Sequence, residues 1–316
     1  METMLTSRPL RACFRPMGLF FQITSNSRAV MDAATATFGG YGRCEPVDSP
    51  DIQCRLIEVE TADVSLEPRY EVKPGASVVE FTGGGTRVTL DTRNGVATGT
   101  IAANLARRPA ALRYHVLQFI LASMLAQRGF LGIHAAACAL NGSAILLRGP
   151  SGAGKTATAY ACLKAGWQTL GESVIWIDTR NRGKCAWGMP WYFHFPPDAV
   201  ALFAELPSEA VLSAGGRDRL EIDVESVREG CTVTHGSPAA IVFLASGERE
   251  LRRLTREEAA VEWPAGATGT ETVFPEYERH VGRLLQMPAW TMARGDVTAA
   301  PDLLGKVLAG SSPGAA

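Results

Sequence analysis

The stretch that decides the fold is the octapeptide Gly149-Pro150-Ser151-Gly152-Ala153-Gly154-Lys155-Thr156, which fits the pattern GxxxxGK[ST] at every fixed position. An apolar run at 143–148 precedes it, and an alanine-rich stretch at 156–165, which predicts a helix, follows it. A phosphate-binding loop requires this order of strand, loop and helix. Its glycines adopt backbone conformations closed to other residues, so successive amides converge on phosphate oxygens at the positive end of the helix. We therefore predict an α/β domain with a nucleotide-phosphate site formed by Gly149, Ser151, Gly152, Ala153, Gly154, Lys155 and Thr156.

Three side chains in and beyond this loop are candidates for the chemistry of the site. Lys155 supplies positive charge for the β- and γ-phosphates, and the Thr156 hydroxyl is a ligand for Mg²⁺. Such a site also needs an acidic residue that holds or orients the metal. Glu172 lies 16 residues beyond Thr156, which leaves room for one helix and one turn, whereas Asp178 emerges at the other end of the apolar strand predicted at 174–178. We therefore predict Thr156 and Glu172 as the Mg²⁺ ligands.

The first part of the chain has the pattern of short strands and turns. β-Favouring runs lie at 18–24, 53–60, 69–72, 77–81, 87–91 and 96–102. Glycine-containing turns at 83–85 and 93–95 separate some of them, and one helical pattern covers 27–38. We predict a smaller α+β N-terminal domain over residues 1–108, with a largely antiparallel sheet and a role in substrate or partner recognition.

Beyond residue 108 the pattern changes. A helix predicted at 110–128 ends at Gly129, and the hairpin dipeptide Asn141-Gly142 separates two apolar runs. A further core strand is predicted at 239–244, whereas the proline-rich 186–197 and the glycine-rich 214–216 predict surface loops. We place a P-loop nucleotide-binding domain at 109–310 and a flexible tail at 311–316.

Composition excludes several classes of protein. With 316 residues, 46% hydrophobic and 20% charged, and a net charge of −1, the chain is unlike a disordered protein and lacks an overall basic field for nucleic acid. Its 7 cysteines contain no CxxC pair, which argues against a zinc site and a secreted disulfide framework. The longest apolar stretch, 110–125, contains Arg113 and is shorter than the roughly 20 residues that span a bilayer. The apolar run at 18–23 is too short for a signal peptide, so we expect a soluble cytoplasmic protein without a membrane partner.

The segment from Ile133-His134-Ala135 through the hairpin and the phosphate loop to Leu170-Gly171-Glu172-Ser173-Val174 resembles the catalytic domain of HPr kinase/phosphorylase. It resembles more closely the HPr-kinase-related proteins encoded beside ribosomally made peptides such as lasso peptides. The resemblance covers roughly residues 130–308, with specific motifs only in 133–178. The N-terminal domain of true HPr kinases has no counterpart in the first 110 residues, so we do not expect HPr itself as the acceptor.

The resemblance implies a P-loop kinase domain of the HPr kinase/PEP-carboxykinase-like type, with a mixed sheet. It also implies transfer of the ATP γ-phosphate to a serine hydroxyl, and an active-site role for His134, although the sequence alone favours a buried core residue there. The family has a pair of Asp residues after the P-loop helix. Here Glu172 matches the first Asp and Ser173 replaces the second, so one negative charge is missing.

The resulting hypothesis is an ATP- and Mg²⁺-dependent kinase acting on a serine of a small ribosomally made peptide or protein. Lys155, Glu172 and His134 are the expected catalytic residues, and Arg217 and Arg219, predicted in a loop, are candidates for a second cation at the transferring phosphate. The aromatic stretch 187–197 forms either an apolar groove for an acceptor or a packed lid. The alternatives are a nucleotide-binding regulatory or partner protein that has lost phosphoryl transfer, and a small-metabolite kinase. The sequence leaves the oligomeric state open.

Overall fold

The computed structural model describes residues 9–61, 69–71, 78–83, 85–207, 209, 212–214, 217–245, 251–272, 274–293 and 297–311. The chain divides into two compact units, Met1–Arg128 and Gly129–Ala316. The sequence-based division had placed the helical segment around 110–126 in the second unit. It belongs to the first because it packs against the helix at 28–38.

The first unit is built on one eight-stranded sheet, with the strand order β3-β1-β2-β4-β8-β7-β6-β5. The strands are β1 (Leu10–Phe14), β2 (Phe21–Ser25), β3 (Arg43–Cys44), β4 (Ile52–Val59), β5 (Arg69–Glu71), β6 (Val78–Gly83), β7 (Thr86–Asp91) and β8 (Val96–Ala102). β2, β4 and β8 are parallel, and the other neighbours are antiparallel. The six β-favouring runs all contain a strand, whereas β1 and β3 were not predicted.

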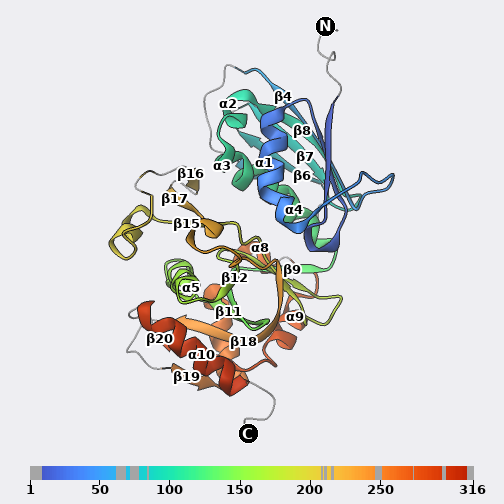
Figure 1. Cartoon of the computed structure of the whole chain (residues 1–316). Coiled ribbons are helices and arrows are strands. Elements are labelled where there is room, and N and C mark those ends of the chain that lie inside the picture. The colour runs from blue at the N-terminus through green and yellow to red at the C-terminus, as the bar shows by residue number, and fades with distance from the viewer. Residues whose placement is uncertain are drawn as a thin grey trace. The chain divides into compact units, whose positions relative to one another are not determined.

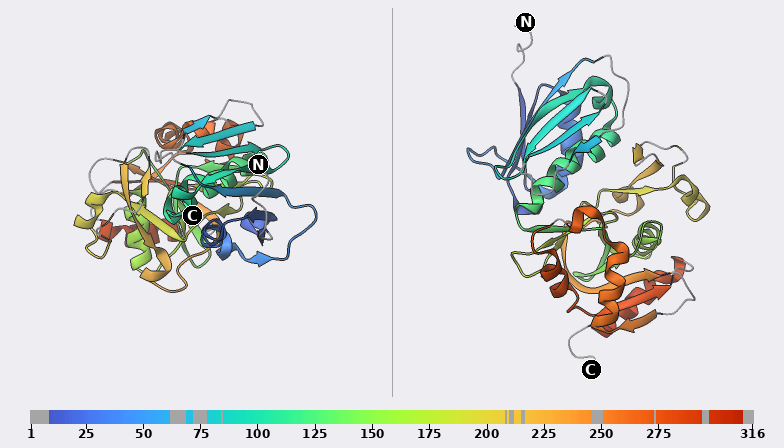
Figure 2. Two further views of the ribbon diagram at one scale, coloured as in Figure 1. Left: turned by 90° about the horizontal axis from the view of Figure 1, so that it is seen from above. Right: turned by 180° about the vertical axis from the view of Figure 1, so that it is seen from behind.

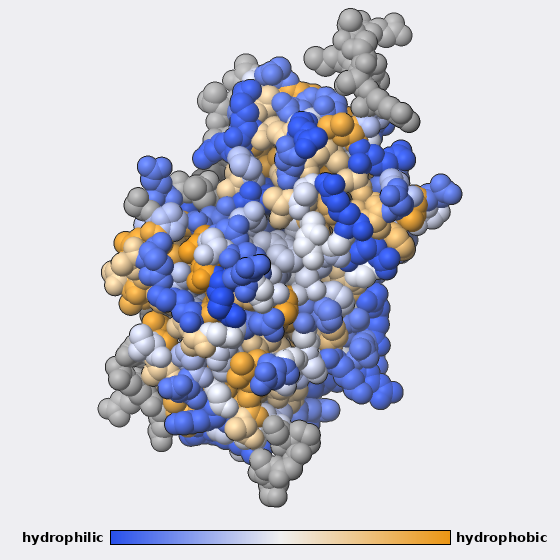
Figure 3. All heavy atoms as spheres, viewed as in Figure 1, coloured by the Kyte–Doolittle hydropathy of each residue, from blue (hydrophilic) through white to orange (hydrophobic). Residues whose placement is uncertain are grey.

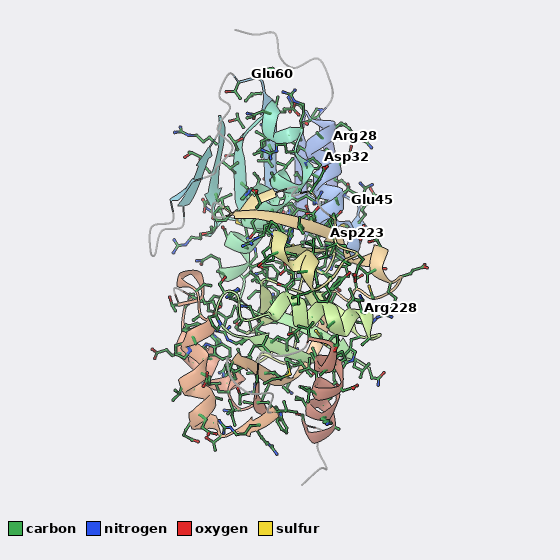
Figure 4. All side chains as sticks on the ribbon, turned by 90° about the vertical axis from the view of Figure 1, so that its left-hand side faces the viewer. Arg28, Asp32, Glu45, Glu60, Asp223 and Arg228 are labelled. Carbon is green, nitrogen blue, oxygen red and sulfur yellow. The ribbon has the colours of Figure 1, made fainter. Side chains whose placement is uncertain are left out.

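Helices cover one face of this sheet, as Figures 1 and 2 show. They are α1 (Arg28–Phe38), α2 (Ala103–Ala106), α3 (Pro109–Ala111), the π-helical segment η3 (Leu112–Leu117) and α4 (Gln118–Ala126). Ser27 caps α1 by accepting a hydrogen bond from the Val30 amide. On the outer face of α1, Arg28 and Asp32 form an exposed ion pair with a nitrogen–oxygen distance of 2.9 Å (Figure 4).

The second unit contains a larger mixed sheet and a separate three-stranded sheet. The main path runs β12-β10-β11-β18-β14-β13-β9, with β20 beside β18 and β19 beside β20; the smaller sheet has the order β15-β17-β16. The strands are β9 (Phe130–Ile133), β10 (Ala136–Leu140), β11 (Ser143–Arg148), β12 (Gln168–Gly171), β13 (Ile175–Asp178), β14 (Ala186–Trp187), β15 (Tyr192–Phe195), β16 (Leu212–Ala214), β17 (Arg217–Asp223), β18 (His235–Ala245), β19 (Leu251–Leu254) and β20 (Ala289–Ala293).

The helices of this unit are α5 (Lys155–Lys164), α6 (Val224–Val227), α7 (Arg256–Glu262), α8 (Gly269–Thr272), α9 (Tyr277–Leu284) and α10 (Ala300–Ser311), with 3₁₀ turns η4 (Pro197–Ala201), η5 (Trp263–Gly266) and η6 (Val297–Ala299). β11, β18 and β20 are parallel, whereas β9, β10, β12 and β13 pair antiparallel with their neighbours. The α/β class with a mixed sheet is thus confirmed. Among the described residues, none of the helices has the length and apolar character needed to cross a lipid bilayer.

The prediction of a surface loop at 186–197 was wrong. This segment contains β14 and β15, and Phe193 and Phe195 are buried in the main core of the unit. Phe195 packs against Tyr160 of α5, with the ring centroids 5.3 Å apart. Of the two interpretations of the aromatic stretch, an apolar groove or a packed segment, the packed one therefore applies to Phe193 and Phe195.

Two other details of the sequence-based assignment need correction. Arg217 and Arg219 lie on strand β17 and not in a loop, because β17 pairs with both β15 and β16. The apolar run before Asn141-Gly142, which covers residues 133–140 in the sequence, is not one strand, since the chain leaves β9 at Ile133 and starts β10 at Ala136. That break places His134 between two strands. Residues 215–216 and 312–316, and the side chain of Arg217, lie outside the described part of the chain.

Candidate functional site

The phosphate loop connects β11 to α5, as the motif predicts. Gly149, Gly152 and Gly154 have φ angles of +149°, +83° and +93°, which L side chains rarely adopt. A Cβ atom on Gly149 would also lie 2.9 Å from the Leu244 carbonyl oxygen. The three glycines are therefore required by backbone conformation, and the loop ends at the positive end of the ten-residue helix α5.

Lys155 lies folded back over this loop. Its Nζ donates to the carbonyl oxygens of Gly149 and Pro150, at 2.8 and 3.0 Å. Burial and the nearby charge of Arg148 lower the pKa of Lys155 to about 8, although the carboxylates of Glu172 and Glu271 oppose the shift. An ammonium group has three donors, so one remains to contact a phosphate in addition to these two carbonyls.

Thr156 and Glu172, the two predicted metal ligands, are in direct contact. The Thr156 hydroxyl donates to Oε2 of Glu172 over 2.8 Å. Glu172 follows β12, which returns antiparallel to β10, so one helix and one short strand bring the carboxylate back to the start of α5. Asp178, the other acidic candidate, binds Arg180 at 2.9 Å.

His194 and Glu221 extend this contact, and the sequence analysis missed both. Oε1 of Glu172 accepts hydrogen bonds from the backbone amide and from Nδ1 of His194, at 3.2 and 3.1 Å. Nε2 of the same ring lies 3.1 Å from Oε2 of Glu221. Burial alone would lower the pKa of His194, but its hydrogen bonds to the two carboxylates raise it to about 9. Both ring nitrogens therefore carry a proton at neutral pH, and the ring is an imidazolium between two acids.

Burial and the nearby charge of Lys155 both lower the pKa of His134. Its backbone amide donates to Glu271, and its Nδ1 lies 3.3 Å from the Gly266 carbonyl oxygen. A carbonyl only accepts, so we assign the proton of the neutral ring to Nδ1. This tautomer leaves Nε2 as an acceptor.

Arg148 and Glu271 form a buried ion pair next to the loop. Their side chains are 0% and 2% exposed, and Nη2 of Arg148 lies 3.3 Å from Oε2 of Glu271. The guanidinium also donates to the Trp263 carbonyl at 3.2 Å and stacks on the Trp263 ring at 3.8 Å. Arg148 is therefore committed to holding η5 and α8 against the end of β11.

The structure brings together the loop residues, Thr156, Glu172 and Lys155, with His134 close enough to sense the lysine charge. Arg219, partly exposed on β17, pairs in backbone register with Leu212, and within the described part of the chain no hydrogen bond links it to the loop. No cluster of three or more His, Cys, Asp or Glu side chains suited to a metal ion occurs among the described residues. A metal here would thus depend on Thr156, Glu172 and oxygen atoms of a bound phosphate.

No protein-family model and no curated protein matches the chain. Among solved structures, the Hpr(Ser) kinase/phosphatase from Coxiella burnetii is similar with a TM-score of 0.31 and 14% identity, over 56% of this chain and 93% of that one. A likeness this weak assigns the chain to no family.

Proposed function

We propose that this chain is an ATP-dependent phosphotransferase that moves the γ-phosphate to a hydroxyl group of a small ribosomally made peptide or protein, with serine as the acceptor. The observation that carries the proposal is the 2.8 Å contact between Thr156 and Glu172 at the start of α5. A carboxylate beside the hydroxyl of a phosphate loop is what a Mg²⁺-dependent phosphoryl transfer needs at that place.

The donor set fits Mg²⁺. A threonine hydroxyl and a carboxylate are hard oxygen donors, and few protein ligands suffice because this ion keeps several waters and phosphate oxygens. Thr156 and Glu172 would hold it. Once bound, the metal would neutralise negative charge on the phosphates.

In the proposed reaction the acceptor oxygen forms a bond to the γ-phosphorus, and the bond from that phosphorus to the bridging oxygen of ADP breaks. The acceptor proton passes to the Glu172 carboxylate and then to solvent. Lys155 and the loop amides stabilise the charge on the transferring group. His134, neutral and an acceptor at Nε2, orients a hydroxyl by accepting its hydrogen bond.

A specific observation favours a second candidate, a nucleotide-binding regulatory or partner protein without transfer. Both oxygens of Glu172 are already engaged, Oε2 by Thr156 and Oε1 by His194. A base must exchange one of these hydrogen bonds for the acceptor hydroxyl. Ser173, which lies next to Glu172, offers no second carboxylate.

Transfer from γ-labelled ATP to synthetic peptides encoded by adjacent genes tests the first candidate. We expect a labelled serine with the wild type, a loss of about 100-fold or more in rate with Glu172→Gln, and no nucleotide binding with Lys155→Ala. The matched control is Asp178→Asn, which removes a carboxylate that binds Arg180 at 2.9 Å and should leave the rate unchanged.

Two results would contradict the assignment. ATP binding without transfer to any peptide, unaffected by Glu172→Gln, favours the second candidate. Activity retained in Lys155→Ala means that the phosphates do not lie on this loop.

A further inference from the structure

A cavity of about 260 Å³ adjoins the phosphate loop, and the side chains that line it are apolar with one exception. The loop itself contributes Ala153, the first turns of α5 contribute Ala157 and Thr158, and Leu244, Met292 and Leu303 come from β18, β20 and α10. Thr158 is the one residue with a polar side chain in this lining.

The cavity lies at the edge of the sheet where a ligand of the loop would extend. β11, β18 and β20 are parallel, with Leu147 beside Val242 and Leu244 beside Met292 in register. Their carboxyl ends therefore meet at one edge, which is where α/β sheets bind ligands. The phosphate loop follows β11 at this edge. Leu244 and Met292 are the next-to-last residues of β18 and β20 and lie at the same edge.

One wall of the cavity is an exposed leucine. Leu202, directly after η4, is 62% exposed, and Figure 3 shows hydrophobic side chains gathered at the left-hand edge, where Figure 1 places this segment. An apolar surface of this kind beside a polar loop marks a ligand or partner site. Ala153 and Gly154 of the loop line the cavity, so it lies directly beside a group bound on the loop.

We infer that this cavity holds the nucleobase of the nucleotide whose phosphates lie on residues 149–156, an inference that rests on the proposed nucleotide binding. A nucleobase is a flat ring with apolar faces, and the methyl and isobutyl groups of the lining offer apolar contact to such a ring. Leu202 loses its exposure when the base binds.

The experiment compares ATP with inorganic tripolyphosphate, which carries the phosphates but no base, by calorimetric titration of the full chain with Mg²⁺. The wild type should bind ATP at least about tenfold more tightly than tripolyphosphate. Leu202→Ala should weaken ATP binding by about three- to tenfold and leave tripolyphosphate unchanged. Leu303→Trp, which fills the cavity, should give a larger loss for ATP alone.

The control is Val261→Ala, which truncates an apolar side chain that is 79% exposed on α7, outside the cavity lining. It should change neither affinity. Leu202 is exposed, so its truncation should leave the fold intact even if Leu303→Trp fails to fold.

The outcomes separate this inference from the proposed function. Equal wild-type affinity for ATP and tripolyphosphate, or a Leu202→Ala variant that weakens both ligands equally or neither, overturns the nucleobase site while the phosphate loop stands. Failure of the wild type to bind either ligand overturns both.

Discussion

At the scale of single residues, folding raises the pKa of His194. Its two ring nitrogens lie 3.1 Å from carboxylate oxygens of Glu172 and Glu221. These hydrogen bonds outweigh burial and raise the pKa of the ring to about 9 from its ordinary 6.5. The folded protein therefore binds this proton more tightly than the unfolded chain does.

This difference predicts a pH dependence of stability. The contribution of His194 is fully present below pH 6.5 and is lost as the pH rises through about 9, because the folded state then gives up its extra proton. Between these limits the contribution of His194 to the free energy of unfolding should fall by about 2–3 kcal/mol. Urea denaturation of the wild type and of His194→Gln at pH 6 and pH 9.5 measures this fall as the difference between the two proteins in how their stability changes with pH.

His280→Gln serves as the control. Burial lowers the pKa of His280, so its proton binding differs between the two states only on the acidic side of 6.5. The variant should keep the change of stability that the wild type shows between pH 6.5 and pH 9.5. If His194→Gln shows the same loss as the wild type, the imidazolium between the two carboxylates does not exist.

Only part of the candidate site could be predicted from the sequence. The loop, Thr156 and Glu172 follow from a contiguous motif and a spacing that one helix and one turn explain. His194 and Glu221 are 27 residues apart and meet only because β15 and β17 pair in register. Arg148 has the charge of a phosphate ligand in the sequence, but only the position of Glu271, more than a hundred residues later, shows that it is buried and paired.

At the scale of elements, the sequence predicted those helices and strands whose formation depends on neighbouring residues in the chain. α1 starts after its Ser27 cap, and β4 alternates buried and exposed residues through Ile52, Cys54 and Leu56. The prediction of a loop at 186–197 was wrong because the prolines and the glycine of this segment dominate its local pattern, while β14 and β15 are only two and four residues long. Burial of Phe193 and Phe195 against Tyr160 stabilises β15, and that contact is tertiary.

Replacement of a glycine in helix α10 should stabilise the protein. Gly305 lies inside this helix, and a Cβ atom there would meet nothing within 4 Å. Gly305→Ala should raise the free energy of unfolding of the second unit by about 0.5–1 kcal/mol, because alanine loses less backbone entropy in a helix. Urea denaturation followed by circular dichroism measures the change, and a decrease would mean that α10 is not helical at this point.

Replacement of Gly99 in β8, by contrast, should destabilise the protein. A Cβ atom there would lie 2.2 Å from the Arg87 carbonyl oxygen, which belongs to the backbone of β7 and cannot move aside alone. Gly99→Ala should destabilise the first unit by about 2 kcal/mol or more. The same denaturation experiment checks it, and an unchanged midpoint would contradict the register of β7 and β8.

At the scale of the whole molecule, the described contacts of the candidate site all come from one unit. Lys155, Glu172, His194, Glu221 and Glu271 find the partners named above within residues 129–316. We therefore expect residues 129–316, expressed alone, to bind ATP with an affinity within about threefold of the full chain. Calorimetric titration of both proteins tests this, and a folded fragment without ATP binding would show that the first unit supplies part of the site.

β18 has a consequence for the order of events during protein synthesis. It pairs with β11, the strand that leads into the phosphate loop, yet it starts at His235, far beyond the Arg148 that ends β11. A ribosome adds residues at about 5–20 per second, so several seconds pass between the two strands. The nascent chain would acquire its capacity for nucleotide only when β18 leaves the exit tunnel, and until then the edge of β11 is open to chaperones.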